Sequence, residues 1–594
     1  MGGYRAPLRE IQFWLGLQTR SGGAPLNDGA VLSDADVSAV LEEAARMAEE
    51  LLDPLYRLAD EQGAALVDGR VRLPPQIKAA YSQFIEAGWV GLPADPEYGG
   101  QGLGHVLATA VNEIWKSANL AFSLCPMLTQ GAIEAVHRHG SDNLRRRFLP
   151  KMISGAWTGT MNLTESHAGS DLGALRTTAV REGDHYRLKG RKIFITWGDH
   201  DLAENIIHLV LARVPDSPPG VHGISMFVVP KILVAEDGSL GENNEITTAS
   251  VEAKLGIHGS PTCVLNYGDD KGAIAYLVGE ENRGLSYMFT MMNSARLAVG
   301  VEGLAMAERA YQQALAYSFE RVQGSRPWAD EPVAIFEHPD VRRMLMFMRA
   351  GTDAMRALSY AAAADLDAGA AGSINAPKAL DRISVLTPIV KGWCTELGQE
   401  LVSIGLQVHG GAGYIEETGA AQIFRDVRIT TIYEGTTGIQ ANDLIGRKLI
   451  SDGGTAVNAL LDDVERCLAA LDSTPDRLVA TRVALRRGLE AARDVVAAVL
   501  EGHEADPNLA GATAVNFLML MGTLLGGWQL ALGAGFATMQ LDAGDAGRPF
   551  LEGKLVTSEF FAEHFMPRIE AYRASAIAGS RTVMGLTREQ LERS

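Results

Sequence analysis

The stretch that says most about this chain is Arg425-Asp426-Val427-Arg428-Ile429-Thr430-Thr431-Ile432-Tyr433-Glu434-Gly435-Thr436-Thr437-Gly438-Ile439-Gln440. It runs from a charged segment through an apolar, strand-like one to Glu434, which stands between an aromatic ring and a glycine. A carboxylate held against apolar surface loses solvation of its charged form, so its pKa rises. Such a carboxylate can serve as a general base toward a weak carbon acid. The local spacing equally fits a buried turn in which Glu434 pairs with Arg425 or Arg428.

The composition is that of an ordinary globular protein with 594 residues, 47% hydrophobic and 21% charged, which is enough for three or four domains or subdomains. The net charge of -19 repels phosphate backbones, so no nucleic-acid binding is expected. Four cysteines are widely scattered without a C-x-x-C pair, so we expect no disulfide framework, no metal site and a reducing, cytoplasmic location. The first residues contain no apolar segment typical of a secretory signal.

One segment, from Asn508 to Leu541, carries no charged residue. A charge-free run of about 20 residues or more is long enough to span a membrane. This run also contains Gly526-Gly527, which would weaken an isolated helix, and several polar residues. The pattern favours one or two helices buried in a helical domain over peripheral contact with a membrane.

Hydrophobic periodicity divides the chain into helical, β-rich and helical parts, and the residues after 450 are expected to form a fourth region. Helical spacing, as in 37–58, is typical of residues 1–156, and short β-rich runs such as 206–212 separated by Gly, Pro and Asp are typical of 157–283. Helical spacing returns in 284–450 and continues through 451–594. The pattern alone predicts an α+β protein with helices outside a β-domain, and the last region is expected to add packing and dimer support.

Several motifs resemble the acyl-CoA dehydrogenase family. Tyr433-Glu434-Gly435-Thr436 is similar to its catalytic-base loop, and Tyr98-Gly99-Gly100-Gln101-Gly102 is similar to its glycine-rich loop. The order of helices, β-domain and helices is also that of the family. The opening Tyr4-Arg5-Ala6-Pro7-Leu8-Arg9 and the extra C-terminal region resemble a long bacterial subgroup that includes 3-methylmercaptopropionyl-CoA dehydrogenases.

The resemblance implies an acyl-CoA dehydrogenase-like fold with an N-terminal helical domain, a β-domain, a helical bundle and an extra helical domain. It also implies FAD as cofactor and an acyl-CoA substrate of short or medium chain, 3-methylmercaptopropionyl-CoA being favoured. Glu434 would remove the α-proton while the β-hydride passes to N5 of FAD, giving the trans-2-enoyl-CoA. Electron-transfer flavoprotein would accept the electrons, and the protein would be a homodimer or a dimer of dimers.

The same resemblance assigns binding residues. Those expected to contact FAD in their own subunit come from the β-domain and the base loop: Met161, Leu163, Thr164, Ser170, Phe194, Ile195, Thr196 and Thr436. Those expected to reach the FAD of the neighbouring subunit lie in two later segments: Arg321, Gln323, Gln407, Gly410 and Gly411. Those expected to contact the acyl-CoA are Ser170, Asn293, Arg296, Tyr433 and Gly435.

Three other functions remain open at this stage. An acyl-CoA oxidase differs in oxygen access to the reduced flavin, which motifs do not reveal. An enoyl-CoA reductase would catalyse the reverse reaction. The redox partner and the thermodynamics decide the direction, and motifs do not. A DNA-associated flavoprotein on the same scaffold is disfavoured by the net charge of -19 and by the absence of a Lys/Arg-rich tail.

Overall fold

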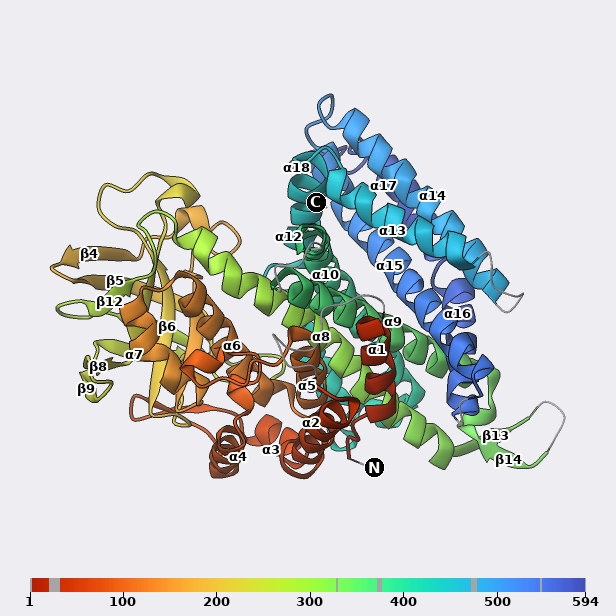
Figure 1. The fold of residues 1–594 in the computed structure, drawn as a ribbon, viewed down its shortest axis with the longest axis horizontal. Helices are drawn as coiled ribbons and strands as arrows, with labels where there is room; N and C mark the ends of the chain where they lie inside the picture. Colours follow the sequence, from red (N-terminus) through yellow and green to blue (C-terminus); the bar gives the residue numbers. More distant parts are fainter. Residues whose placement is uncertain are drawn as a thin grey trace.

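The protein consists of a β-rich body joined to a larger helical one, as the computed structural model shows (Figure 1). The structure describes residues 3–20, 32–326, 330–370, 376–471, 478–544 and 547–592. The long helix α8 (Gly284–Glu320) leads from the β-rich body into the helical one (Figure 1). The expected fold class is confirmed, since helices precede, follow and cover a central sheet.

The N-terminal region is helical, as expected. Its elements are α1 (Leu8–Arg20), α2 (Asp34–Met47), α3 (Pro54–Gln62), the hairpin β1 (Ala65–Val67) and β2 (Arg70–Arg72), α4 (Pro75–Glu86), α5 (His105–Ala118), α6 (Leu120–His139) and α7 (Asp142–Ile153). Ser33 and Asp36 form a capping box that starts α2, because each side chain accepts from the other's backbone N–H. Helix α6 is buried along most of its length, so its neighbours pack against it on several sides.

The β-domain is built on an eight-stranded sheet of order β10-β11-β5-β12-β7-β6-β3, with β4 paired to β5. Its strands are β3 (Trp157–Asn162), β4 (Thr178–Glu182), β5 (His185–Thr196), β6 (Asn205–Ala212), β7 (Ser225–Pro230), β10 (Ile246–Val251), β11 (Thr262–Tyr267) and β12 (Ala273–Leu277), with β8 (Ile232–Val234) and β9 (Leu240–Asn243) in a separate hairpin. β3 and β6 are parallel, and the other pairs are antiparallel. Every residue of β6 is buried, so helices cover this part of the sheet.

The central helices pack backbone against backbone. They are α8, α9 (Pro339–Ala370), α10 (Ala376–Val408), α11 (Ala420–Val427) and α12 (Thr437–Asn442), with a hairpin of β13 (Val322–Ser325) and β14 (Pro332–Ala334) after α8. A Cβ on Gly303 of α8 would lie 2.4 Å from the carbonyl oxygen of Cys394, and one on Gly398 would lie 2.5 Å from that of Gly303. Only glycines allow α8 and α10 to approach so closely.

One local prediction was wrong. The apolar, strand-like segment before Glu434 forms a 3-10 helix over Arg428–Thr431 followed by a turn. Thr430 supports the helical turn, because its buried hydroxyl donates to the carbonyl oxygen of Val427 at 2.7 Å. Local side-chain bonding of this kind outweighs the β-propensity of Ile and Thr.

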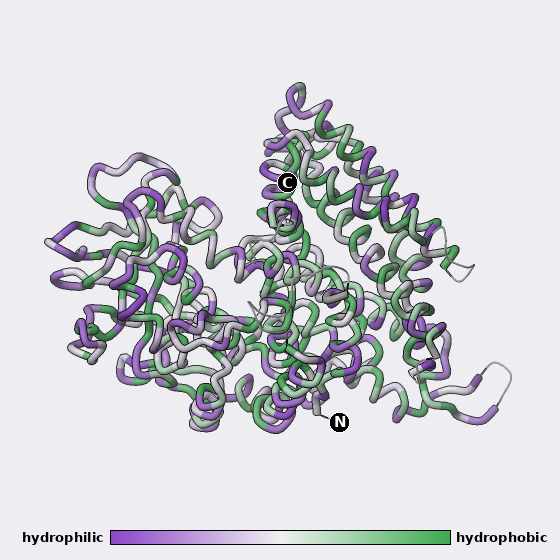
Figure 2. The backbone as a smooth tube through the Cα atoms, in the orientation of Figure 1, coloured by the Kyte–Doolittle hydropathy of each residue, from purple (hydrophilic) through white to green (hydrophobic). Residues whose placement is uncertain are grey.

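The C-terminal region is a helical bundle of α13 (Thr455–Leu471), α14 (Val479–Gly502), α15 (Leu509–Asp542), α16 (Arg548–His564), α17 (Arg568–Ile577) and the short α18 (Arg588–Leu591). The outer helices alternate hydrophobic and hydrophilic residues, as amphipathic helices do (Figure 2). Residues 554–580 contain most of α16 and all of α17. They are separated before Arg568 by Pro567, which cannot donate the backbone hydrogen bond that would continue α16.

Helix α15 is the charge-free segment, and it is a buried core helix, as expected. It is long and apolar enough to cross a membrane, yet 61% of its most apolar window is buried inside the protein. A Cβ on Gly522 would lie 2.1 Å from the ring of Trp393, and one on Gly533 would lie 2.4 Å from the ring of Trp14. The glycines therefore admit indole rings from α10 and α1. Peripheral contact with a membrane stays an untested expectation.

A buried network of charges ties the three helical regions together. The Arg356 guanidinium of α9 donates to Glu113 of α5 at 2.7 Å and to Glu308 of α8 at 2.8 Å. It also donates to Asp353 at 3.2 Å, and Lys554 of α16 reaches the same Asp353 carboxylate at 2.7 Å. Burial raises the pKa of Glu113, while the Arg356 guanidinium opposes that rise. The network is consistent with a fixed arrangement of four helices.

Replacing Arg356 with Met should destabilise the protein by about 3–5 kcal/mol, because it leaves buried carboxylates without their cation. The matched control is Arg493→Met, which removes an exposed arginine paired with Asp462 and Glu465 and should cost about 1 kcal/mol or less. Urea-induced unfolding followed by circular dichroism measures both. Equal shifts of the two midpoints would contradict the role given to the network.

Candidate active site

Glu434 lies in a strained turn between the 3-10 helix Arg428–Thr431 and α12. Its φ is +54° and that of Gly435 is +89°. A positive φ costs a glutamate free energy, and such strain gathers at functional positions. The turn is held by Gln440, whose amide donates to the Glu434 carbonyl oxygen at 3.1 Å, and α12 is capped by the Thr436 hydroxyl. The fold therefore fixes this carboxylate in a defined place.

The surroundings of Glu434 favour its neutral form. Burial raises the pKa of its carboxyl to about 7, and the negative charge of Glu302 adds to that rise. The cations of Arg296 and Lys391 act in the opposite direction. The predicted pairing of Glu434 with Arg425 or Arg428 is not seen among the described contacts, and the expectation of a raised pKa is met.

Arg425 and Arg428 have partners elsewhere. Arg425 pairs with Asp60 of α3 and donates to Glu416 at 3.0 Å. Arg428 donates to the hydroxyl of Thr431 at 2.6 Å. These arginines hold the segment before the turn in place. The charges that act on Glu434 come from other helices.

Arg296 stands beside the candidate base and not on an open surface. Its side chain is buried, pairs with Asp443 at 3.3 Å and contacts the exposed Asn293 at 3.4 Å. A guanidinium already paired with a carboxylate is a weak candidate for binding phosphates of CoA. The arrangement instead supports an electrostatic role next to Glu434.

Three charged residues of the site were missed in the sequence. Glu302 of α8, Lys116 of α5 and Lys391 of α10 are all fully buried. Lys391 Nζ has no hydrogen-bond partner in the described part of the chain, and burial lowers its pKa to about 8. The available signal was a lone charge within an otherwise apolar helical run, as in Leu297 to Ala307.

The edge of the β-domain gathers the residues expected to meet the flavin. The segments after β3 and at the end of β5 are joined by the Ile193 N–H, which donates to the Thr164 carbonyl oxygen at 2.9 Å. Along this edge Met161, Leu163, Thr164 and Thr196 are partly exposed. Phe194 is 59% exposed with φ +60°.

This edge fits a flat heterocycle. A strained phenylalanine facing solvent is costly unless a ligand covers it, and the threonines beside it offer hydroxyls. The side chain of Ile195 is buried in the core of the sheet, so its backbone is what remains for a ligand. Ser170 is exposed in the loop after β3, so its hydroxyl is accessible.

A second set of expected FAD contacts lies at the other end of α8 and α10. It consists of exposed residues: Arg321, Gln323, Gln407, Gly410 and Gly411. The two segments are neighbours, because the rings of Tyr317 and His409 lie 4.6 Å apart. Along α8, Tyr317 lies roughly 22 Å beyond Glu302, which contacts the base turn. A single chain therefore presents these residues outward, at a distance from Glu434.

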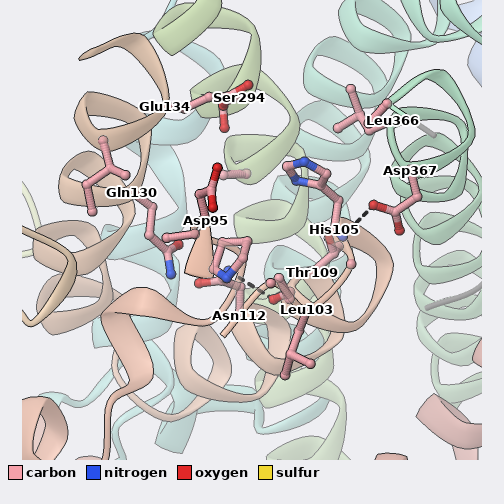
Figure 3. Close-up of a pocket in the computed structure, with 18 of the residues that line it drawn as sticks. Asp95, Leu103, His105, Thr109, Asn112, Gln130, Glu134, Ser294, Leu366 and Asp367 are labelled. Carbon is pink, nitrogen blue, oxygen red and sulfur yellow. Dashed lines mark hydrogen bonds between the residues drawn. The ribbon is translucent and has the colours of Figure 1, made fainter. Parts of the chain in front are cut away.

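Figure 3 shows a cavity of about 650 Å³ between the loop 93–105 and helices α5, α6, α8 and α9. Its polar lining includes His105, whose backbone N–H donates to Asp367 at 2.6 Å (Figure 3). Glu434 is not among the residues that line it. The cavity reaches Met127, whose sulfur lies 3.1 Å from Lys116 Nζ.

Family models match nearly the whole chain. The N-terminal, middle and C-terminal domains of acyl-CoA dehydrogenase match residues 34–156, 160–269 and 282–449. The model described as acetyl-CoA dehydrogenase C-terminal like matches residues 460–587, which includes most of the C-terminal bundle.

Individual relatives agree with these matches. The chain is 47% identical over 582 residues to the 3-methylmercaptopropionyl-CoA dehydrogenase of Ruegeria pomeroyi, covering 96% of this chain and 97% of that protein. The fold is shared with Caenorhabditis elegans ACDH-11 in complex with C11-CoA, with a TM-score of 0.81, 21% identity and coverage of 98% and 96% of the two chains. It is also shared with a Bacillus anthracis acyl-CoA dehydrogenase complexed with FAD, with a TM-score of 0.74, 20% identity and coverage of 92% and 88%. The chain therefore belongs to the acyl-CoA dehydrogenase family of FAD-dependent oxidoreductases.

Proposed function

We propose that this protein dehydrogenates the α,β-bond of an acyl-CoA thioester to the trans-2-enoyl-CoA, with Glu434 as the base. The observation that carries the proposal is a carboxyl group in a strained turn with a pKa raised to about 7. A base with a pKa near the working pH combines a useful charged fraction with enough basicity to remove a proton from carbon.

The α-proton of a thioester is a weak acid, so the base needs assistance. The backbone N–H of Glu434 belongs to the same turn and, by resemblance to the family, donates to the thioester carbonyl oxygen. A fixed donor of this kind is worth about 3 kcal/mol in the transition state. Arg296 and Lys391 stabilise the ionised form of Glu434 before the proton is taken.

The cofactor of the proposed reaction is FAD. Met161, Leu163, Thr164, Phe194 and Thr196 would hold its ring system at the edge of the β-domain. When bound, FAD supplies the acceptor for the hydride that leaves Cβ. Electron-transfer flavoprotein is proposed as the protein that then receives the electrons.

The favoured substrate is 3-methylmercaptopropionyl-CoA or another short to medium acyl-CoA. The relative with 47% identity over 96% of this chain carries the first of these substrates in its name.

Anaerobic addition of CoA thioesters of several lengths to the purified holoenzyme tests the proposal. We expect 3-methylmercaptopropionyl-CoA to bleach the visible band of the oxidised flavin. Glu434→Gln should keep FAD and bind the thioester but lose bleaching by about 1,000-fold or more, since no carboxylate takes the proton. The control Glu416→Gln changes an exposed carboxylate of the same segment and should bleach normally.

Two results would contradict this proposal. Near-normal bleaching by Glu434→Gln would remove Glu434 from the role of base. A yellow wild-type protein that no thioester bleaches would remove the dehydrogenase reaction. After bleaching, rapid return of the oxidised-flavin colour in air would indicate an acyl-CoA oxidase.

The pH dependence follows from the raised pKa of Glu434. The base must be ionised, so kcat/KM should rise with pH through about 7 and lose about tenfold per unit below it. Steady-state assays from about pH 5 to 9 with a saturating electron acceptor measure this limb. A profile that stays flat through pH 7 and falls only near the pKa of an ordinary glutamate would contradict the assignment.

We also propose that the exposed Arg321 set completes the FAD site of a second subunit in a homodimer or dimer of dimers. Two mixed dimers distinguish the arrangements. Pairing Arg321→Ala with Glu434→Gln leaves one intact site if Arg321 acts across subunits. Pairing an Arg321→Ala/Glu434→Gln double variant with wild type then leaves no intact site. Tagged heterodimers should therefore show about half of the wild-type activity in the first mixture and little in the second. The reverse order would place Arg321 in its own subunit's site.

A further inference from the structure

Three polar side chains, two of them fully buried, form a connected group behind the base turn. Lys116 Nζ of α5 lies 3.1 Å from the Glu302 carboxylate of α8. The hydroxyl of Tyr433 donates to the other oxygen of the same carboxylate. Lys116 and Glu302 are both fully buried, so water does not compete for these contacts.

The position of this group is costly for the fold. A buried ion pair often contributes no more stability than apolar side chains of the same size would. The flanking residues of α8 are apolar, and burial lowers the pKa of Lys116 while Glu302 opposes that effect. The pair is consistent with a role other than stability.

Its nearest functional neighbour is Glu434. Tyr433 directly precedes Glu434, the residue with the strained φ of +54°. Tyr433 has no freedom to swing away while its hydroxyl is bound to Glu302. The orientation of the peptide between Tyr433 and Glu434 is thus tied to α8, and through Lys116 to α5.

Charged groups on the helices around the base turn act on Glu434 directly or on the groups beside it. They are Arg296 and Glu302 of α8, Lys391 and Glu396 of α10, Asp443 and Arg447 beyond α12, and Lys116 of α5 behind Glu302. Glu396 accepts from the Thr437 hydroxyl, and Asp443 pairs with Arg296. Among these groups Glu302 opposes the ionisation of Glu434, whereas Arg296 and Lys391 favour it.

We propose that Glu302, held by Lys116, is a positioning residue that fixes Tyr433 and thereby sets the orientation and the charge environment of Glu434. The proposal rests on the function proposed above, because it assigns Glu434 as the base. Glu302 has two separable effects. It holds the turn through a hydrogen bond to Tyr433, and it places a negative charge behind the carboxyl.

The charge effect is tested by titrating the Glu434 carboxyl directly. Infrared difference spectra of the holoenzyme across pH show the protonated carboxyl band, and loss of that band in Glu434→Gln assigns it. Glu302→Gln should lower the pKa of Glu434 by about 1 unit, because a negative charge is removed and Lys116 is left unpaired. The control Glu308→Gln removes an equally buried carboxylate of α8 that binds Arg356, and it should leave the titration unchanged.

The positioning effect is tested by Tyr433→Phe, which keeps both charges of the pair. We expect kcat to fall about tenfold or more with a smaller change in KM, since the turn loses its anchor. The titration of Glu434 should stay near that of wild type. This variant also serves if Glu302→Gln fails to fold.

The outcomes separate this inference from the proposed function. An unchanged titration in Glu302→Gln, or an equal shift in Glu308→Gln, would overturn the charge effect. A normal kcat in Tyr433→Phe would overturn the positioning effect. Either result with normal bleaching by wild type leaves the dehydrogenase proposal standing. Loss of that proposal through an active Glu434→Gln would not alter the infrared result.

Discussion

The site depends on one constraint, which is that a carboxylate must lose much of its solvation without being neutralised by a close ion pair. Glu434 meets it because the turn that carries it is wedged against α8 and α10. These helices approach so closely at Gly303 and Gly398 that side chains at the crossing are excluded. The cations of Arg296 and Lys391 on these helices act on the carboxyl. Neither forms a salt bridge with it among the described contacts. Burial and charge are balanced, and the pKa is raised to about 7.

The rest of the scaffold holds the base turn and helices α8 and α10 in place. Helix α10 is held from its far side by α15, whose Gly522 admits the ring of Trp393. Helix α8 is held by the buried carboxylates around Arg356, which also reach α5 and α16. The C-terminal bundle is therefore part of the support of the central helices, even though none of the residues assigned to the chemistry lies in it.

Much of this could be predicted from the sequence, because the relevant signals are local. Periodicity distinguishes the helical regions from the β-domain, and the quoted motif around Glu434 contains the proposed base. The pattern of Ile429 to Tyr433 predicted a strand and was misleading. β-branched residues also suit a 3-10 turn when a buried threonine hydroxyl bonds to the backbone. Lys116 and Glu302 lie far apart in the chain, so no local pattern links them. Their pairing with Tyr433 depends on how α5, α8 and the base turn meet in space.

The pairing of Arg296 could not be predicted for the same reason. An arginine early in a helix next to a CoA-binding region suggests a phosphate partner, whereas Asp443, which neutralises it, lies on a distant segment. The Ile195 side chain lies in the core of the sheet, because alternation along β5 points it there.

The central claim, that Glu434 removes the α-proton, can be tested apart from hydride transfer. A thioester with sulfur in place of the β-carbon can lose its α-proton but has no β-hydride to give. Incubated with the holoenzyme in D₂O and followed by NMR, it should exchange its α-hydrogens with wild type and fail to do so with Glu434→Gln. Equal exchange with both proteins would show that another group is the base.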